Sequence, residues 1–316
     1  MHSTPNRIPP TSVGGTRGPA VRRHCRGAAA GRLPAAAVFG IVALLASLGV
    51  RARGPGDATL VINSELKPVI VKVPKFPFVD KAKVAKVKVT LRLKEADSKP
   101  NQITDDEDWF ARNVLPHPPL DLSEESRFVP ADTRWGILRH FRSNGNDLFV
   151  GVYQETQPRK DGVYDTHFLY RAVVFDKDYN PLRIFVLDNF FPDILEMSTM
   201  QPVGNILYFD CNYNGYASIL EKKTGYLVAM DLTTGDVLWA SKNLTASAWH
   251  FLVLDDTLVA GYGFTDEPDF LYLLNRHDGS LLQTVKLKSA HSFLIAKGNR
   301  LYVRTYDTDY VFDIKR

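Results

Sequence analysis

Three histidines are the side chains best suited to metal chemistry in this sequence. His140, His250 and His291 each stand at the start of an expected strand in successive repeats. Zinc sites need imidazole, thiolate or carboxylate ligands at a matched spacing. No cysteine or carboxylate shares the spacing of these histidines, and His291 is one position out of step with His250. Histidines that lie in the core or line a channel are therefore the favoured interpretation, and we expect no metal site.

Two acidic segments are the remaining candidates for catalysis. Residues 105–108 are consecutive carboxylates directly before Trp109, and such a charge run in a loop is typically solvated. Asp307, Asp309 and Asp313 lack the glycine and the terminal glutamate of a calcium-binding loop. We therefore expect no catalytic residue in either segment.

Aromatic side chains in the long connections between expected strands indicate binding instead. Tyrosine offers a large contact area together with a polar hydroxyl group, which suits recognition surfaces. The expected ligand-binding residues are Tyr153, Tyr164, Tyr213, Tyr216, Tyr262, Phe264 and Asp266, with Glu267 beside them. The alternative is that the tyrosines flank the strands and pack between neighbouring sheets.

Repeated sequence units predict the elements that position these residues. One unit reads GNDLFVG from Gly145, GNILYFD from Gly204, DDTLVAG from Asp255 and GNRLYVR from Gly298. A second unit follows the first three, with Asp176, Asp231 or Asn275 four positions before Asn180, Gly235 or Gly279. An Asp or Asn side chain caps a tight turn, and Gly or Asn accepts the positive φ that closes it. Each repeat is therefore expected to hold two hairpins, and hence four strands.

Four-stranded repeats of about 40–60 residues are typical of β-propeller blades. We therefore expect an all-β propeller with four recognisable blades over residues 135–316. A β-sandwich is the alternative, and the internal alignment disfavours it. Residues 95–134 are either a linker or a further irregular blade, which would make five blades or more.

The last repeat ends before its fourth strand, so an N-terminal strand is expected to complete it. The candidates are LVINS (60–64) with PVIVKV (68–73), and VAKVKVTLRLK (84–94). In a propeller, the first-to-second and third-to-fourth turns lie at one end of the strands. The long connections after Tyr153, Asp210 and Tyr262 then gather at the opposite end, which carries the expected binding residues.

Charge separates the chain into three parts. Residues 1–56 hold eight arginines and no acid, and Lys67–Lys94 holds nine basic residues against Asp80 alone. Residues 95–316 are acidic, with a net charge near −10. This acidity disfavours binding to a phosphate backbone, so no nucleic-acid partner is expected. The lysines of 81–94 either attract anionic lipid headgroups or, as we favour, keep an exposed strand from pairing at its edge.

An uncharged segment predicts a membrane anchor. Leu33–Val50 has 18 residues without a charge, and a spanning helix needs about 17–25 apolar residues. Six arginines precede it and two follow closely, which predicts an exported, periplasmic or extracellular C-terminal region. A buried core helix and a cleaved signal peptide, which would release a secreted protein, are the alternatives. The expected organisation is a basic disordered leader (1–32), a transmembrane or signal-anchor helix (33–50), a linker with N-terminal strands (51–134) and propeller repeats (135–316).

The segment GYLVAMDLTTGDVLW, Gly225–Trp239, resembles the repeat of pyrroloquinoline-quinone-type (PQQ-like) β-propellers. The matching residues are Ala229, Asp231, Thr234, Gly235 and Trp239. The next repeat has Gln283 in place of the tryptophan. That family comprises quinone-dependent dehydrogenases and cofactor-free scaffolds such as the bacterial outer-membrane assembly lipoprotein. The chain has too few repeats for the former and no lipobox for the latter, so the resemblance implies a cofactor-free member.

These observations favour a membrane-tethered binding or scaffold module over an enzyme. Its expected partners are a protein or envelope ligand at the long-loop end and the membrane through Leu33–Val50. The alternative is a degenerate quinoprotein-like dehydrogenase or a propeller-fold hydrolase that uses carboxylates near the channel.

Overall fold

The computed structural model describes residues 55–101, 109, 122–158, 166–192, 194–247, 249–264 and 267–316. The described residues all belong to one compact unit. The leader and Leu33–Val50 lie outside the described residues, so the anchor prediction remains a prediction. Within the described ranges, no helix combines the length and the apolar character that a membrane crossing requires.

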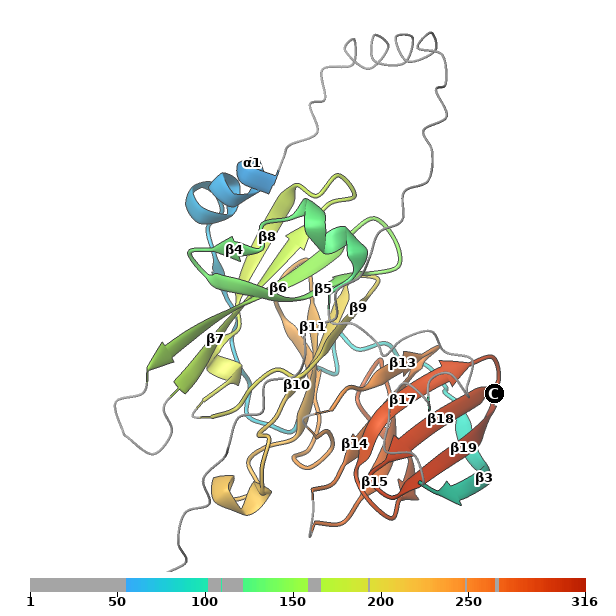
Figure 1. Ribbon diagram of the computed structural model, residues 1–316. Coiled ribbons are helices and arrows are strands. Elements are labelled where there is room, and N and C mark those ends of the chain that lie inside the picture. Colours follow the sequence, from blue (N-terminus) through green and yellow to red (C-terminus); the bar gives the residue numbers. More distant parts are fainter. Residues whose placement is uncertain are drawn as a thin grey trace, which may run out of the picture. The chain divides into compact units, whose positions relative to one another are not determined.

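Four sheets follow one another along the chain (Figure 1), so the all-β prediction is confirmed. The first holds β4 (Asp132–Thr133), β5 (Gly136–Ser143), β6 (Phe149–Pro158), β7 (Thr166–Phe175) and β8 (Pro181–Val186). The second holds β9 (Met200–Val203), β10 (Ile206–Cys211), β11 (Tyr226–Asp231) and β12 (Val237–Ala240). The third holds β13 (Leu252–Leu254), β14 (Thr257–Tyr262), β15 (Phe270–Asn275) and β16 (Leu281–Lys286). The fourth holds β17 (His291–Lys297), β18 (Arg300–Thr305) and β19 (Thr308–Lys315).

Both recurring sequence units lie where the repeat predicts them. The first unit forms the turn into β6, β10, β14 and β18, and the second unit forms the hairpins β7–β8, β11–β12 and β15–β16. In each sheet, strands that follow one another in the chain pair in antiparallel fashion as a meander, which is how the blades of a propeller are built, whereas β1 (Val69–Ile70) adds to β8 in parallel. The short helical elements among the described residues are α1 (Pro55–Leu60), a π-helix (Val61–Glu65) and the 3-10 helices Glu124–Phe128, Asp188–Phe190 and Ala217–Leu220.

Hydrophobic side chains join each sheet to the next. Buried residues of the first and second sheets share one cluster, those of the second and third share another, and those of the third and fourth share a third. Leu207, Leu258 and Leu301, the repeated leucines of the second strands, are fully buried in these clusters. Removing apolar surface from water is the main stabilising contribution here, and it requires the sheets to pack face to face.

An aromatic side chain on the outer strand of one sheet packs against a turn glycine of the next. Trp239 of β12 lies so close to Gly279 that a Cβ there would be 2.6 Å from the indole ring. The Trp239 Nε1–H also donates to the carbonyl of Arg276, at 2.9 Å. Phe185 of β8 meets Gly235 in the same way, with a Cβ 2.9 Å from the ring. The glycines of the repeat therefore serve the contact between sheets as well as their own turns.

Acidic or amide side chains cap the hairpin turns as predicted. Asp231 accepts the main-chain N–H groups of Thr233 and Thr234 at 2.6 and 3.0 Å. Gly235 and Gly279 have positive φ values of 78° and 70°.

The prediction for the first of these turns was wrong in one respect, because Tyr179, with φ 62°, takes the positive φ there and Asn180 does not. Asn180 precedes Pro181, and the proline ring disfavours helical backbone at the residue before it. The Asn180 side chain instead donates to Asp176, at 3.0 Å.

The basic N-terminal segment runs along the outer strands of all four sheets. In this strap, residues 69–100, β1 (Val69–Ile70) pairs with β8 and β2 (Phe78–Val79) pairs with β12. β3 (Arg92–Pro100) pairs with β19 as the fourth strand of the last sheet, and it appears in teal beside β19 in Figure 1. It overlaps only the end of the 84–94 candidate, whereas residues 60–64 lie in the helical turn before β1.

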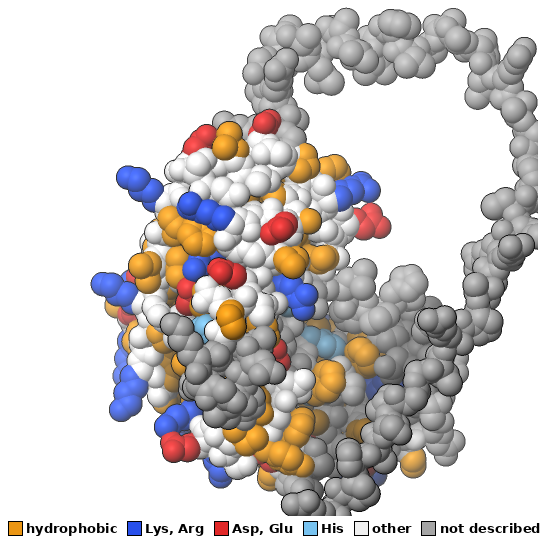
Figure 2. Space-filling view, turned by 60° about the vertical axis from the view of Figure 1, so that its left-hand side comes forward, with side chains coloured by type: hydrophobic (Ala, Val, Ile, Leu, Met, Phe, Trp, Pro, Cys, Tyr) orange, Lys and Arg blue, Asp and Glu red, His pale blue; other side chains and the backbone are white. Residues whose placement is uncertain are grey.

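The strap also contacts the third sheet, through side chains. Gln283 of β16, which occupies the place of Trp239, bonds both the N–H and the carbonyl of Leu93, each at 2.8 Å. Asn275 donates to the carbonyl of Val87 at 3.2 Å. The face drawn in Figure 2 mixes basic, acidic and hydrophobic side chains, and no single sign of charge dominates it.

Candidate binding site at the long-loop end

The long connections gather at one end of the strands because the strands of each meander alternate in direction. They are the links from the second to the third strand within a sheet and from the fourth strand to the next sheet. The described links with side chains of interest run over 212–225, 241–251 and 263–269, the last two with gaps. This end is called the long-loop end below, and the opposite end the short-turn end.

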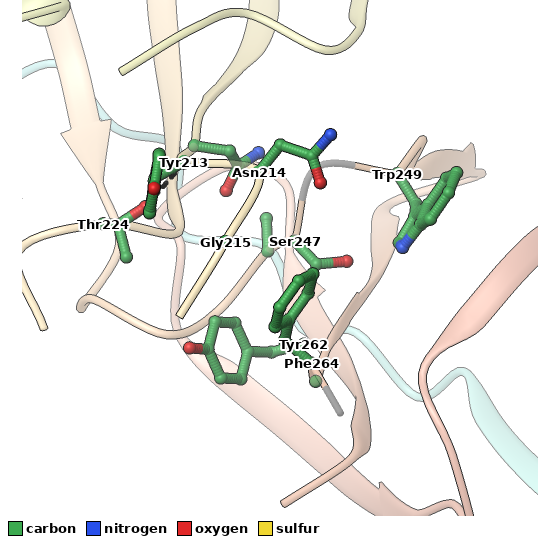
Figure 3. A pocket seen from close by; sticks show the side chains of 11 residues that line it. Tyr213, Asn214, Gly215, Thr224, Ser247, Trp249, Tyr262 and Phe264 are labelled. Atoms are coloured by element: carbon green, nitrogen blue, oxygen red, sulfur yellow. Dashed lines mark hydrogen bonds between the residues drawn. The ribbon is translucent and has the colours of Figure 1, made fainter. Parts of the chain in front are cut away.

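Loops of the second and third sheets form a shallow depression there (Figure 3). Tyr213, Gly215, Trp249, Tyr262 and Phe264 are among its lining residues. Its interior is only about 10 Å³, which is close to the space that one water needs. The depression is thus too small to enclose a small molecule, and its use would lie in the contact surface around it.

Tyr262 fixes two of these loops to each other. Its hydroxyl group donates to Glu267, whose other carboxylate oxygen accepts the N–H of Ala217 at 2.9 Å. The Tyr262 side chain is buried, and burial together with the neighbouring Glu267 raises the pKa of its phenol well above its usual range. Tyr262 therefore positions the loops and offers little surface to a partner.

Tyr213 also has a mainly structural environment. Its ring packs against the core between the first and second sheets, and its N–H donates to Thr224 Oγ1 at 2.8 Å. A Cβ at Gly215 would be 2.5 Å from the Tyr213 ring, so the loop can pass the ring only because residue 215 is glycine.

Exposed aromatic and apolar side chains surround these buried ones. Tyr216, 38% exposed, meets Phe264 edge to face with ring centroids 5.0 Å apart. Trp249 is 44% exposed, and Figure 3 shows its side chain at the edge of the group, away from Tyr262. Ile219, in the same link as Tyr216, is 51% exposed, and Tyr306, in the link from β18 to β19 at the same end, is 88% exposed. Large exposed apolar side chains concentrated in loops are typical of contact surfaces.

The expected residues thus divide between the core and the surface. Tyr153 is fully buried and its hydroxyl donates to the Pro130 carbonyl at 2.9 Å. It therefore offers no surface to a partner, contrary to the expectation that it lies in a binding surface. Burial raises the pKa of its phenol well above the usual range. Its strand lies between two others of the first sheet, and this inward-facing position carries it into the core. Tyr164 and Asp266 lie outside the described residues.

Trp249, Ile219 and Tyr306 were missed by sequence reasoning. Trp249 lies in a link between two sheets, and only the links within sheets were considered. Bulky apolar residues among Ser, Thr, Asn and Gly were the available signal.

One buried and one half-buried carboxyl group near this end have raised pKa values. Asp210 is fully buried, and it accepts the N–H groups of Ser198 and Thr199 at 2.9 Å and the Asn212 side chain at 2.6 Å. Burial raises its pKa to about 8. Asp269 has a pKa raised to about 6, by burial first and then by the nearby Asp307 and Glu267.

The histidines are part of the packing between sheets. His291 is buried, its Nε2–H donates to the His250 carbonyl at 3.0 Å, and its ring fits because residue 261 is glycine. His140 lies in β5 of the first sheet, apart from this pair in the chain's repeat order. Among the residues that the structure describes, no three His, Cys, Asp or Glu side chains come together as a metal site.

Comparisons with known proteins give distant similarities only. No family model and no curated protein matches the chain. BamB from Moraxella catarrhalis is 15% identical over 59% of this chain and 72% of its own, with a TM-score of 0.27. A europium-containing methanol dehydrogenase is 12% identical over 47% of this chain and 27% of its own, with a TM-score of 0.28. A HIRA fragment is 11% identical over 50% of this chain and 44% of its own, with a TM-score of 0.31. At these scores the fold assignment rests on the strand pairing itself, and the PQQ-like resemblance remains one of sequence motif.

Proposed function

We propose that this chain is an exported, membrane-tethered binding module whose long-loop end captures a protein or envelope ligand. The observation that supports it most is the set of exposed side chains Tyr216, Ile219, Trp249 and Tyr306, all at one end of the strands. Aromatic side chains dominate the binding energy of many protein interfaces. Binding there would remove these side chains from water.

The supports of this surface suit a preorganised binding site. Tyr262, Glu267 and the Ala217 N–H connect two loops from different sheets. Loops held in this way lose less conformational entropy when a partner binds. The depression itself is too small for a substrate, which favours recognition of a surface over turnover of a small molecule.

The tether in this proposal is Leu33–Val50, with its arginine-rich N-terminal side inside the cell. In intact cells, a protease added outside is expected to remove an epitope at the C-terminus and to leave one at the N-terminus. Protection of the C-terminal epitope in intact cells, with cleavage after lysis, would contradict the export.

The binding surface is tested with a double variant, Tyr216→Ala with Trp249→Ala. Because these side chains are 38% and 44% exposed, folding should be retained. Capture of the cellular partner by the purified full chain should weaken about tenfold or more. The matched control is Leu182→Ala at the short-turn end, where Leu182 is 42% exposed. Equal capture by all three proteins would refute the assignment.

A further inference from the structure

A second hollow lies at the outer rim between the second and third sheets. This rim groove has a volume of about 650 Å³ and shares no lining residue with the depression at the long-loop end. Strap residues 77–86, segment 240–245 after β12 and turn 278–281 before β16 form its walls. Volumes of about 300–1,000 Å³ are usual for small-molecule sites.

The groove follows from the path of the strap. The strap adds a strand to the outer edge of the first and second sheets, whereas no described part of it pairs as a strand with the third sheet, which it contacts through side chains such as Asn275 and Gln283. β16 therefore remains the edge of its sheet, and the rim beside it is hollow. Tyr272 and Leu274 of β15 are among the side chains left facing the groove.

Apolar side chains line much of the groove. Val79 and Leu281 are 42% and 59% exposed, and Val84 and Tyr272 are half-buried beside them. Such exposure in a concave site leaves apolar surface that a hydrocarbon chain would remove from water.

Positive charge is the second property of the groove. Lys81, Lys86 and Lys242 line it and are exposed, and none of them forms an ion pair within the described part of the chain. Lys83, beside them, is instead paired with Asp236 at 2.8 Å. The lining carboxylate of Asp278 already accepts the N–H and hydroxyl of Ser280, at 2.9 and 2.6 Å.

The neutral polar side chains of the groove are already hydrogen-bonded within the protein. The Ser241 and Thr245 hydroxyls donate to the Lys242 carbonyl at 2.8 and 2.9 Å, and Asn243 donates to the Lys222 carbonyl at 2.8 Å. A peptide brings main-chain groups that need such partners, whereas an alkyl chain needs none. The chain's own leader, residues 1–32, holds six arginines and no acid, so the lysines would repel it.

We propose that the rim groove binds a single-chain anionic amphiphile of the fatty-acid class. Its hydrocarbon chain would pack on Tyr272, Leu274 and Leu281, and its carboxylate would lie among Lys81, Lys86 and Lys242. The site is separate from the long-loop end, so it is independent of the proposed capture of a partner.

The test uses a photoreactive dodecanoate analogue with the full chain, followed by mass-spectrometric mapping of the labelled peptides. The expected labels fall within 77–86, 240–245 and 272–281, and excess unlabelled dodecanoate should abolish them. Mapping distinguishes labelling of this groove from labelling of the uncharged segment Leu33–Val50. The neutral dodecanol analogue should label these segments at least about tenfold less, because it lacks the charge that the lysines attract.

Two triple variants of equal charge provide the control. Lys81→Glu with Lys86→Glu and Lys242→Glu should reduce the labelling about tenfold or more. Lys72→Glu with Lys88→Glu and Lys94→Glu, on the same strap but outside the groove, should leave it unchanged. All six lysines are exposed, so circular dichroism should show that both variants remain folded.

Four results would overturn the proposal. The first three are labels confined to other segments, equal labelling by the alcohol and the acid, and equal loss of labelling in both triple variants. The fourth is an unlabelled groove together with a dimer, seen by sedimentation, that Leu281→Asp converts to monomers. The last result would assign the groove to a second copy of the chain.

Discussion

The two ends of the strands differ in how completely their polar and apolar groups are used. At the short-turn end, Asp231 caps a turn and the Trp239 ring packs on Gly279. The Arg276 carbonyl accepts hydrogen bonds from the Trp239 indole N–H and the Tyr208 hydroxyl. At the long-loop end, Tyr262 and Glu267 hold the loops while neighbouring aromatic side chains stay exposed. The side chains of one end are therefore used in joining the sheets, whereas the other end leaves aromatic side chains exposed, as the proposed binding surface requires.

The largest effect is expected from filling the space between Gly279 and Trp239. Gly279→Ala would place a Cβ 2.6 Å from the indole at a φ of 70°, and should lower the free energy of unfolding by about 3 kcal/mol. Gly298→Ala has a similar φ, 59°, but nothing within 4 Å, and should lower it by about 1 kcal/mol. Denaturant unfolding measures both. Equal losses would show that the contact between sheets contributes nothing beyond the turn.

The next effect concerns pH. Burial lowers the pKa of His291 to about 3, with the neighbouring His250 acting in the same direction. The unfolded chain binds a proton near pH 6.5 and the folded chain only near pH 3, so stability is lost as the pH falls between these values. The contribution of His291 to this loss by pH 5 should be about 2 kcal/mol. Because the raised pKa values of Asp210 and Asp269 change stability in the opposite direction over this range, the test follows His291 itself. Its ring signals in NMR should not titrate between pH 8 and 5, and a midpoint near 6.5 would contradict its burial.

Removal of a turn cap should have a smaller effect. Asp231→Ala leaves the N–H groups of Thr233 and Thr234 without their acceptor and should lower the free energy of unfolding by about 1 kcal/mol. Thr233→Ala, in the same turn, keeps the acceptor and should change it by less than about 0.5 kcal/mol. If the two variants unfold at the same denaturant concentration, the cap does not stabilise the short-turn end.

The smallest effect on stability is expected at the long-loop end. Tyr216→Ala and Trp249→Ala should each change the free energy of unfolding by less than about 0.5 kcal/mol, because the two side chains lie at the surface, 38% and 44% exposed. A loss above about 2 kcal/mol would mean that these side chains hold the fold and are not kept for a partner.

The short-turn end could be predicted from the sequence because its requirements are local. A cap at Asp231 and a positive φ at Gly235 depend on residues within one hairpin, and Asp or Asn with Gly or Asn recurs at these two positions in the first three repeats. The prediction of a positive φ at Asn180 was wrong because Pro181 disfavours that backbone conformation at the residue before it, although the proline was visible in the sequence.

The long-loop end could not be predicted in the same way. Tyr153 and Tyr216 are the same residue type, yet one is buried and the other exposed because of packing between segments distant in sequence. The partner of Gln283 is Leu93, 190 positions away, and no local pattern indicates that contact. Loop residues follow no period, so their exposure becomes known only from the structure.

Site-specific crosslinking in cells compares the two ends most directly. A photoreactive amino acid replaces Tyr216, Trp249 or Tyr306 at the long-loop end, or Asn146, Asp178 or Asn299 at the short-turn end. We expect a discrete adduct with one partner from the first three positions and none from the second three. Adducts from the short-turn positions alone, or from none of the six, would contradict the assignment of the binding surface to the long-loop end.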